Sequence, residues 1–171
     1  MKRVVIFLGA MLLATVLLPS GLTPPVPASA TTTYSFNLDP PNTAKAEGGA
    51  TIRVTGAGTF TFDTEGAGSV VASGSFTEFN KNGSVFARGT WQATAFTSFW
   101  AFGGPNPGTQ GGQLKITVTL FPDGGPPVTG VSMIVNCRVF ASVVGFTEEE
   151  GTAVGVFTER TGGTTLFHLD N

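Results

Sequence analysis

Residues 69–93 read SVVASGSFTEFNKNGSVFARGTWQA, and this stretch decides the fold. Every second residue from Val70 to Phe76 is apolar or glycine, which is typical of one face of an extended strand. Asn80–Gly83 then reads NKNG and predicts a tight hairpin turn, because Asn-Gly readily adopts the positive φ that such a turn requires. Every second residue from Val85 to Ala93 is again apolar or glycine. The stretch therefore predicts an antiparallel hairpin.

The same alternation recurs along most of the chain, and the segment Ala44–Ala50 between two such stretches reads as a small, polar loop. Turn residues separate the alternating segments at fairly regular spacing, which favours a meander. The sequence predicts an all-β fold: a single antiparallel meander of about eight strands, with a closed barrel favoured over a sandwich because closure removes exposed edges. The expected strands are 31–38, 51–62, 69–79, 85–93, 114–120, 131–139, 152–157 and 164–169.

The first thirty residues have the three-part pattern of a secretory signal peptide. Lys2 and Arg3 are followed by the uncharged apolar run Val4–Leu18, and Ala28-Ser29-Ala30 supplies the small residues of a cleavage site. We expect residues 1–30 to be removed, and residues 31–171 to form a single secreted domain, either extracellular or periplasmic.

Composition excludes several classes of function. Without Lys2 and Arg3, seven basic side chains stand against eleven acidic ones, and no basic patch is present. We therefore expect no nucleic-acid partner and, after signal cleavage, no membrane association. Cys137 is the only cysteine, so the chain cannot form an internal disulfide, and we interpret it as a small buried hydrophobic residue. An intermolecular disulfide and a reactive thiol are the alternatives.

The chain is poor in groups that carry catalysis. His168 is the only histidine, and we expect it to be exposed on the last strand. One histidine makes a zinc site improbable, and Glu148-Glu149-Glu150 reads as a solvated acidic loop without the spacing of a calcium site. No metal and no cofactor are predicted.

Glu78 is the candidate functional carboxylate. It is in phase with Phe76 and so is expected on the inner face, although Phe79 hints at a bulge that could turn it outward. The basic residues within strands all oppose the apolar face and are expected outside: Arg53, Arg88, Lys115 and Arg138.

Aromatic residues are the candidate ligand-binding groups. The segments Gly58-Thr59-Phe60, Gly74-Ser75-Phe76 and Gly89-Thr90-Trp91 repeat a pattern in which each glycine lets an aromatic ring lie over a neighbouring strand. Residues 91–102 are unusually rich in Trp and Phe, as expected of either a core plug or a platform for flat apolar ligands. The candidate lining residues are Phe60, Phe62, Phe76, Trp91 and Trp100.

The chain has a secretory signal followed by about eight meandering strands. In this layout it broadly resembles lipocalin, dirigent and allene-oxide-cyclase barrels. The resemblance implies architecture alone. We hypothesise a secreted, non-enzymatic barrel that binds a small apolar or aromatic ligand, or a protein partner. The alternatives are a barrel enzyme of the isomerase or cyclase kind that uses Glu78 as general acid or base, and a structural or surface-adhesive protein.

Overall fold

The computed structural model describes residues 30–103, 108–137 and 150–170. Residues 1–29 of the predicted signal peptide, Arg138 and Glu148-Glu149 lie outside these ranges. Within them the chain forms ten strands and no helix, and accordingly no helix is long and apolar enough to cross a membrane. The strands are β1 (Thr31–Asn37), β2 (Asn42–Ala46), β3 (Thr51–Asp63), β4 (Gly68–Phe79), β5 (Val85–Gly103), β6 (Thr109–Pro122), β7 (Val128–Cys137), β8 (Gly151–Val154), β9 (Phe157–Gly162) and β10 (Phe167–Asp170).

The strands belong to one antiparallel sheet, which confirms the predicted meander. Each strand from β2 to β8 pairs with the next strand in the chain, and β9 pairs back with β2 to complete a ring of eight. The remaining two strands pair with each other, β1 also along β3 and β10 also along β6. The first and last described strands are thereby incorporated into the sheet.

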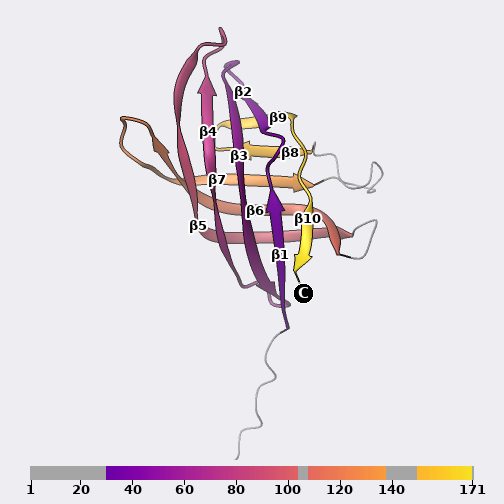
Figure 1. Cartoon of the computed structure of the whole chain (residues 1–171). Helices are drawn as coiled ribbons and strands as arrows, with labels where there is room; N and C mark the ends of the chain where they lie inside the picture. The colour runs from indigo at the N-terminus through magenta and orange to yellow at the C-terminus, as the bar shows by residue number, and fades with distance from the viewer. Residues whose placement is uncertain (1–29, 104–107, 138–149, 171) are drawn as a thin grey trace, which may run out of the picture.

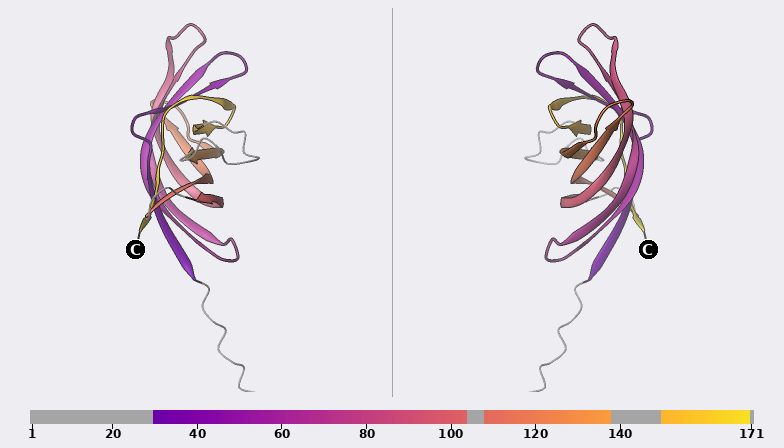
Figure 2. Two further views of the ribbon diagram at one scale, coloured as in Figure 1. Left: turned by 90° about the vertical axis from the view of Figure 1, so that its right-hand side faces the viewer. Right: turned by 90° about the vertical axis from the view of Figure 1, so that its left-hand side faces the viewer.

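The sheet folds into two layers that cross at a steep angle. In Figure 1 the strands β1, β3 and β4 run upright, and β6, β7 and β8 run across behind them. The side views in Figure 2 show the second layer against the concave face of the first. The long strand β5 passes from one layer into the other, with three register irregularities after Gln92 that let it bend.

The predicted hairpin is confirmed, but two local predictions are wrong. The Asn80 N–H donates to the Ser84 carbonyl oxygen at 2.8 Å, and Gly83 has the expected positive φ of 83°. The predicted loop 44–50 is instead partly strand, because β2 finds partners on both sides in β3 and β9. The predicted strand 152–157 is broken at Gly155, where a φ of 56° turns the chain between β8 and β9.

Aromatic rings fill one half of the space between the layers. Phe60 is the centre of this aromatic cluster, with ring centroids 4.8 Å from Phe99, 5.5 Å from Tyr34 and 5.7 Å from Phe167. Aliphatic side chains from β3, β6, β7 and β8 fill the other half. The core therefore has an aromatic end and an aliphatic end.

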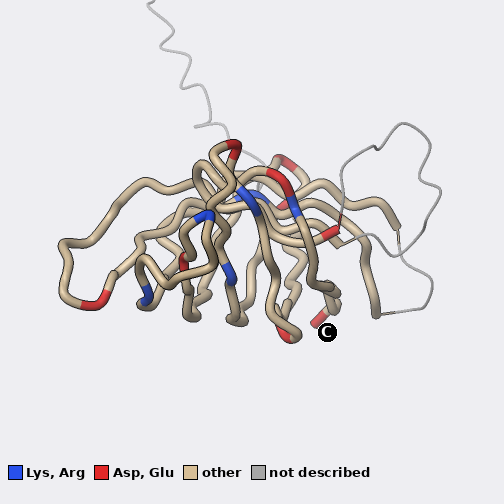
Figure 3. The backbone as a smooth tube through the Cα atoms, turned by 90° about the horizontal axis from the view of Figure 1, so that it is seen from above, with Lys and Arg blue, Asp and Glu red and all other residues tan. Residues whose placement is uncertain are grey.

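The described basic side chains that were predicted to face outward do so. Arg53, Arg88 and Lys115 are exposed. Figure 3 shows acidic and basic positions scattered over the tube without a concentration of either sign. Two ion pairs among described residues, Lys45–Glu159 at 3.9 Å and Arg88–Asp123 at 3.3 Å, both join exposed side chains.

Candidate functional site

An apolar pocket of about 200 Å³ lies at the aliphatic end of the core, where the last residues of β4 meet the corner between β6–β7 and β8–β9. Its walls are almost entirely hydrocarbon, and Glu78 provides the single ionisable group among its lining residues. The pocket is lined by Ile52, Glu78, Leu120, Val128, Val131, Val154, Gly155, Val156 and Phe157.

Strand register directs Glu78 into this pocket. Glu78 lies opposite Ile52 of β3 and Ala87 of β5, and both neighbours pack against the core. It is two residues from the buried Phe76, so the two side chains share the inner face. The bulge suspected from Phe79 is present as a register shift between Glu78 and Phe79, yet it does not remove Glu78 from the pocket.

The surroundings of Glu78 change its chemistry. Burial against hydrocarbon raises the pKa of the Glu78 carboxyl above its ordinary value, because the apolar walls disfavour the ionised form. The protonated carboxyl can donate one hydrogen bond, and the carboxylate can accept hydrogen bonds or take up a proton. A carboxyl group in such a pocket can therefore orient a ligand or transfer a proton.

The rim of the pocket leaves apolar side chains in contact with solvent. Val156 is 73% exposed and Val128 is 48% exposed, although both line the pocket. Gly155 permits this arrangement, since its positive φ makes the tight turn that carries Val156 over the opening. An exposed apolar rim continuous with a pocket is a feature of ligand entry sites.

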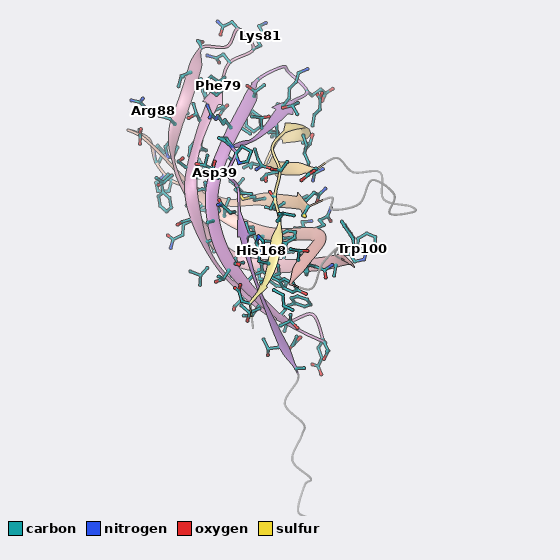
Figure 4. The ribbon with its side chains drawn as sticks, turned by 45° about the vertical axis from the view of Figure 1, so that its right-hand side comes forward. Asp39, Phe79, Lys81, Arg88, Trp100 and His168 are labelled. Atoms are coloured by element: carbon teal, nitrogen blue, oxygen red, sulfur yellow. The ribbon has the colours of Figure 1, made fainter. Side chains whose placement is uncertain are left out.

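The structure places the five aromatic candidates elsewhere. Phe60 and Phe62 belong to the aromatic cluster, and Phe76 and Trp91 are buried in the core. Trp100 is 60% exposed, and Figure 4 shows it far from Phe79, the neighbour of Glu78. Of the predicted site residues, Glu78 alone lines the pocket.

Sequence reasoning missed the aliphatic walls. Val131 carries a usable signal, because it lies in phase with Met133 and Val135 of β7. Nothing in the sequence shows that Val128, the first residue of β7, and Val156, in the turn between β8 and β9, meet at the same corner. The walls of the pocket come from the ends of several strands, which meet only when the ring of strands closes.

The other candidates for chemistry are isolated. His168 is exposed on β10, opposite Ser35, as predicted. Cys137 is buried and unpaired with another cysteine, and burial raises its thiol pKa to about 11. The Glu150 carboxylate accepts a hydrogen bond from the Thr165 backbone at 3.4 Å. Over residues 30–103, 108–137 and 150–170, no three His, Cys, Asp or Glu side chains are grouped to hold a metal ion.

Comparison with known proteins adds no assignment: no family model, no curated protein and no solved structure matches this chain.

Proposed function

We propose that this protein is a secreted binding protein that takes one compact, mainly apolar molecule into the pocket around Glu78. The observation that carries the proposal is a hydrocarbon-walled pocket with a single carboxyl group and an exposed apolar rim. Apolar walls supply affinity through burial, and one polar group fixes the orientation of the ligand. The predicted signal peptide supports a role outside the cytoplasm.

The size of the pocket restricts the ligand. About 200 Å³ is below the roughly 300–1,000 Å³ of sites for drug-sized molecules. A branched or cyclic molecule with one hydroxyl group fits these walls, since its hydroxyl can pair with Glu78 while its hydrocarbon part is removed from water. Cyclohexanol is a suitable probe, and methylcyclohexane is its counterpart without the hydroxyl.

The test is a nuclear magnetic resonance titration of the isotope-labelled chain with these two probes. We expect cyclohexanol to shift the methyl signals of Val131 and Val154 in a saturable manner, and methylcyclohexane to bind at least ten-fold more weakly. Glu78→Gln keeps the shape of the side chain and is expected to reduce the preference of the pocket for cyclohexanol over methylcyclohexane. Val156→Asp changes only a side chain at the rim that is already 73% exposed, and is expected to weaken the binding of both probes.

Glu159→Gln provides the matched control, because it changes a carboxylate of the same type that is 61% exposed on the outside of β9. Its titrations are expected to equal those of the unmodified chain. Shifts spread over the whole surface, or none at the pocket methyl groups, would rule out a ligand site at Glu78.

A second function, proton transfer by an isomerase-like enzyme, is favoured by the raised pKa of Glu78. A carboxyl group whose pKa is raised toward neutrality is better matched to general acid–base catalysis. The test is deuterium uptake next to the carbonyl of cyclohexanone in heavy water. Uptake that the chain accelerates and Glu78→Gln abolishes would establish catalysis; equal uptake with both proteins would leave binding as the function.

A further inference from the structure

Strand β4 is paired on both sides for only part of its length. Its whole length pairs with β3, but its pairing with β5 begins at Ser73, opposite Gln92. Beyond Gln92 the strand β5 turns away into the other layer (Figure 1). Residues Gly68–Ala72 therefore have no strand beside them on that side within the described chain. We call this segment the open edge.

The hydrogen-bond pattern shows which backbone groups the open edge presents. The Asp63 N–H donates to the Ala67 carbonyl oxygen at 2.9 Å, which makes these two residues a hydrogen-bonded pair of the β3–β4 hairpin. Hydrogen-bonded pairs alternate along an antiparallel ladder, so Ser69 and Val71 also bond to β3. The intervening residues, Gly68, Val70 and Ala72, direct their N–H and C=O groups away from β3 and toward the open edge.

The open edge lacks the features that normally block strand addition. Charged side chains, prolines and bulges protect free edges in soluble proteins. Residues 68–77 contain neither a charged residue nor proline, and the β3–β4 register is uninterrupted. The free edge of β5 differs, because three register irregularities interrupt it. Val71 is 77% exposed on β4, beside a hollow of about 320 Å³ at the point where β4 and β5 separate.

We propose that the open edge binds an extended peptide segment of another protein, which adds to β4 as a strand. The alternate N–H and C=O groups require an extended backbone as the ligand. The site lies at the other end of β4 from Glu78, so it is independent of the pocket and of the function proposed for it.

Charge indicates which peptide fits. The turn that precedes the open edge carries Asp63 and Glu65 and no basic residue. A peptide that adds to β4 in the antiparallel direction has its carboxyl-terminal end beside this turn. The complementary partner therefore has an uncharged paired stretch followed by Lys or Arg.

A second copy of this chain fits less well. If two open edges paired antiparallel about Val70, Gly68 of one copy would face Ala72 of the other, and Ala67 would face Ser73. Gln92 of β5 already occupies the position beside Ser73. The turn of one copy would thus collide with β5 of the other, whereas a separate peptide can leave the sheet at that point.

The test uses the peptide Thr-Val-Thr-Val-Thr-Lys-Lys and a control in which both lysines are glutamate. Amide hydrogen exchange of the chain alone is expected to be slow at Val71 and fast at Val70 and Ala72. The lysine peptide is expected to slow exchange at Val70 and Ala72 at least ten-fold, and the glutamate peptide to have a markedly smaller effect. Equal protection of all three amides before peptide is added would overturn the proposal.

Two variants separate backbone from side-chain recognition. Val70→Pro removes a donor on the open edge without removing a bond to β3, and is expected to abolish peptide binding. Val71→Thr changes the exposed side chain and keeps every backbone group, and is expected to retain binding within about two-fold. Circular dichroism checks that both variants fold. Protection that appears without peptide and rises with protein concentration would identify a second copy as the occupant, contrary to the proposal.

Discussion

The indole N–H of Trp91 donates to the backbone carbonyl oxygen of Thr55 at 2.8 Å, across the full width of strand β4. Trp91 belongs to β5 and Thr55 to β3, and Gly74 of β4 is the register partner of Trp91 between them. The indole can cross because Gly74 has no side chain: a methyl group there would lie 2.6 Å from the indole nitrogen. The bond thus ties three adjacent strands together.

Gly74→Ala is therefore expected to destabilise the fold. The added methyl group would overlap the Thr55 carbonyl oxygen and push the Trp91 ring out of its site. We expect a loss of about 1–3 kcal/mol or more in the free energy of unfolding, the usual cost of overpacking a core. Urea denaturation measures it, with Gly48→Ala as the matched control because no atom lies within 4 Å of the added group there. Equal stability of the two variants would contradict this role of Gly74.

Phe60→Ala is expected to cost about 3–5 kcal/mol, because Phe60 is 1% exposed and its ring contacts several others of the aromatic cluster. Trp100→Ala is the comparison, since its side chain is 60% exposed. We expect that change to stay within about 0.5 kcal/mol of the unmodified chain. Thermal unfolding followed by circular dichroism distinguishes the two. A large effect of Trp100→Ala would show that this ring has a packing role.

The meander could be predicted from the sequence. The predicted glycine–aromatic relationship is confirmed at Gly74, where the Trp91 ring crosses, but the atoms nearest to Gly58 and Gly89 belong to no aromatic ring. Alternation locates Val70–Phe76 on one face, Asn82-Gly83 specifies the turn, and the phase of Glu78 places it inside. These signals are local, because each depends on residues within one or two strands.

The strands that close the ring, and the position of the pocket, could not be predicted. β2 has the sequence NTAKA, whose small and polar residues do not distinguish a strand from a loop. It becomes a strand because β3 and β9 supply hydrogen-bonding partners on both sides. The pocket likewise depends on closure, since Val128 of β7 and Val156 of the β8–β9 turn come from separate parts of the chain that only the complete ring brings to Glu78. The abundance of aromatic residues instead led us to predict Phe60 and Trp91 as ligand-lining residues, but both are buried in the core.

Glu78 is expected to make stability depend on pH. Its pKa is raised in the folded state by burial, so below the ordinary value of about 4.5 the carboxyl is protonated in both states and stability is unaffected. As the pH rises through the folded-state pKa, ionisation costs more in the folded chain than in the unfolded chain, and stability is lost. Glu78→Gln has no such loss.

The melting temperature of Glu78→Gln is therefore expected to rise relative to the unmodified chain between about pH 4 and about pH 7. Glu159→Gln alters an exposed carboxylate on β9 and is not expected to reproduce the trend. The same melting temperature difference for Glu78→Gln at both pH values would show that the pocket does not penalise the carboxylate.

Cys137 is expected to be chemically inert in the folded chain. Its side chain is fully buried, and burial raises the thiol pKa to about 11, so only about one thiol in ten thousand is ionised at neutral pH. Labelling with iodoacetamide is expected to be slow in buffer and at least a hundred-fold faster in denaturing urea. Below pH 10 the rate on the unfolded chain is also expected to rise with pH as thiolate forms. Rapid labelling of the folded chain at neutral pH would mean that Cys137 is accessible, and would restore the alternative of an intermolecular disulfide.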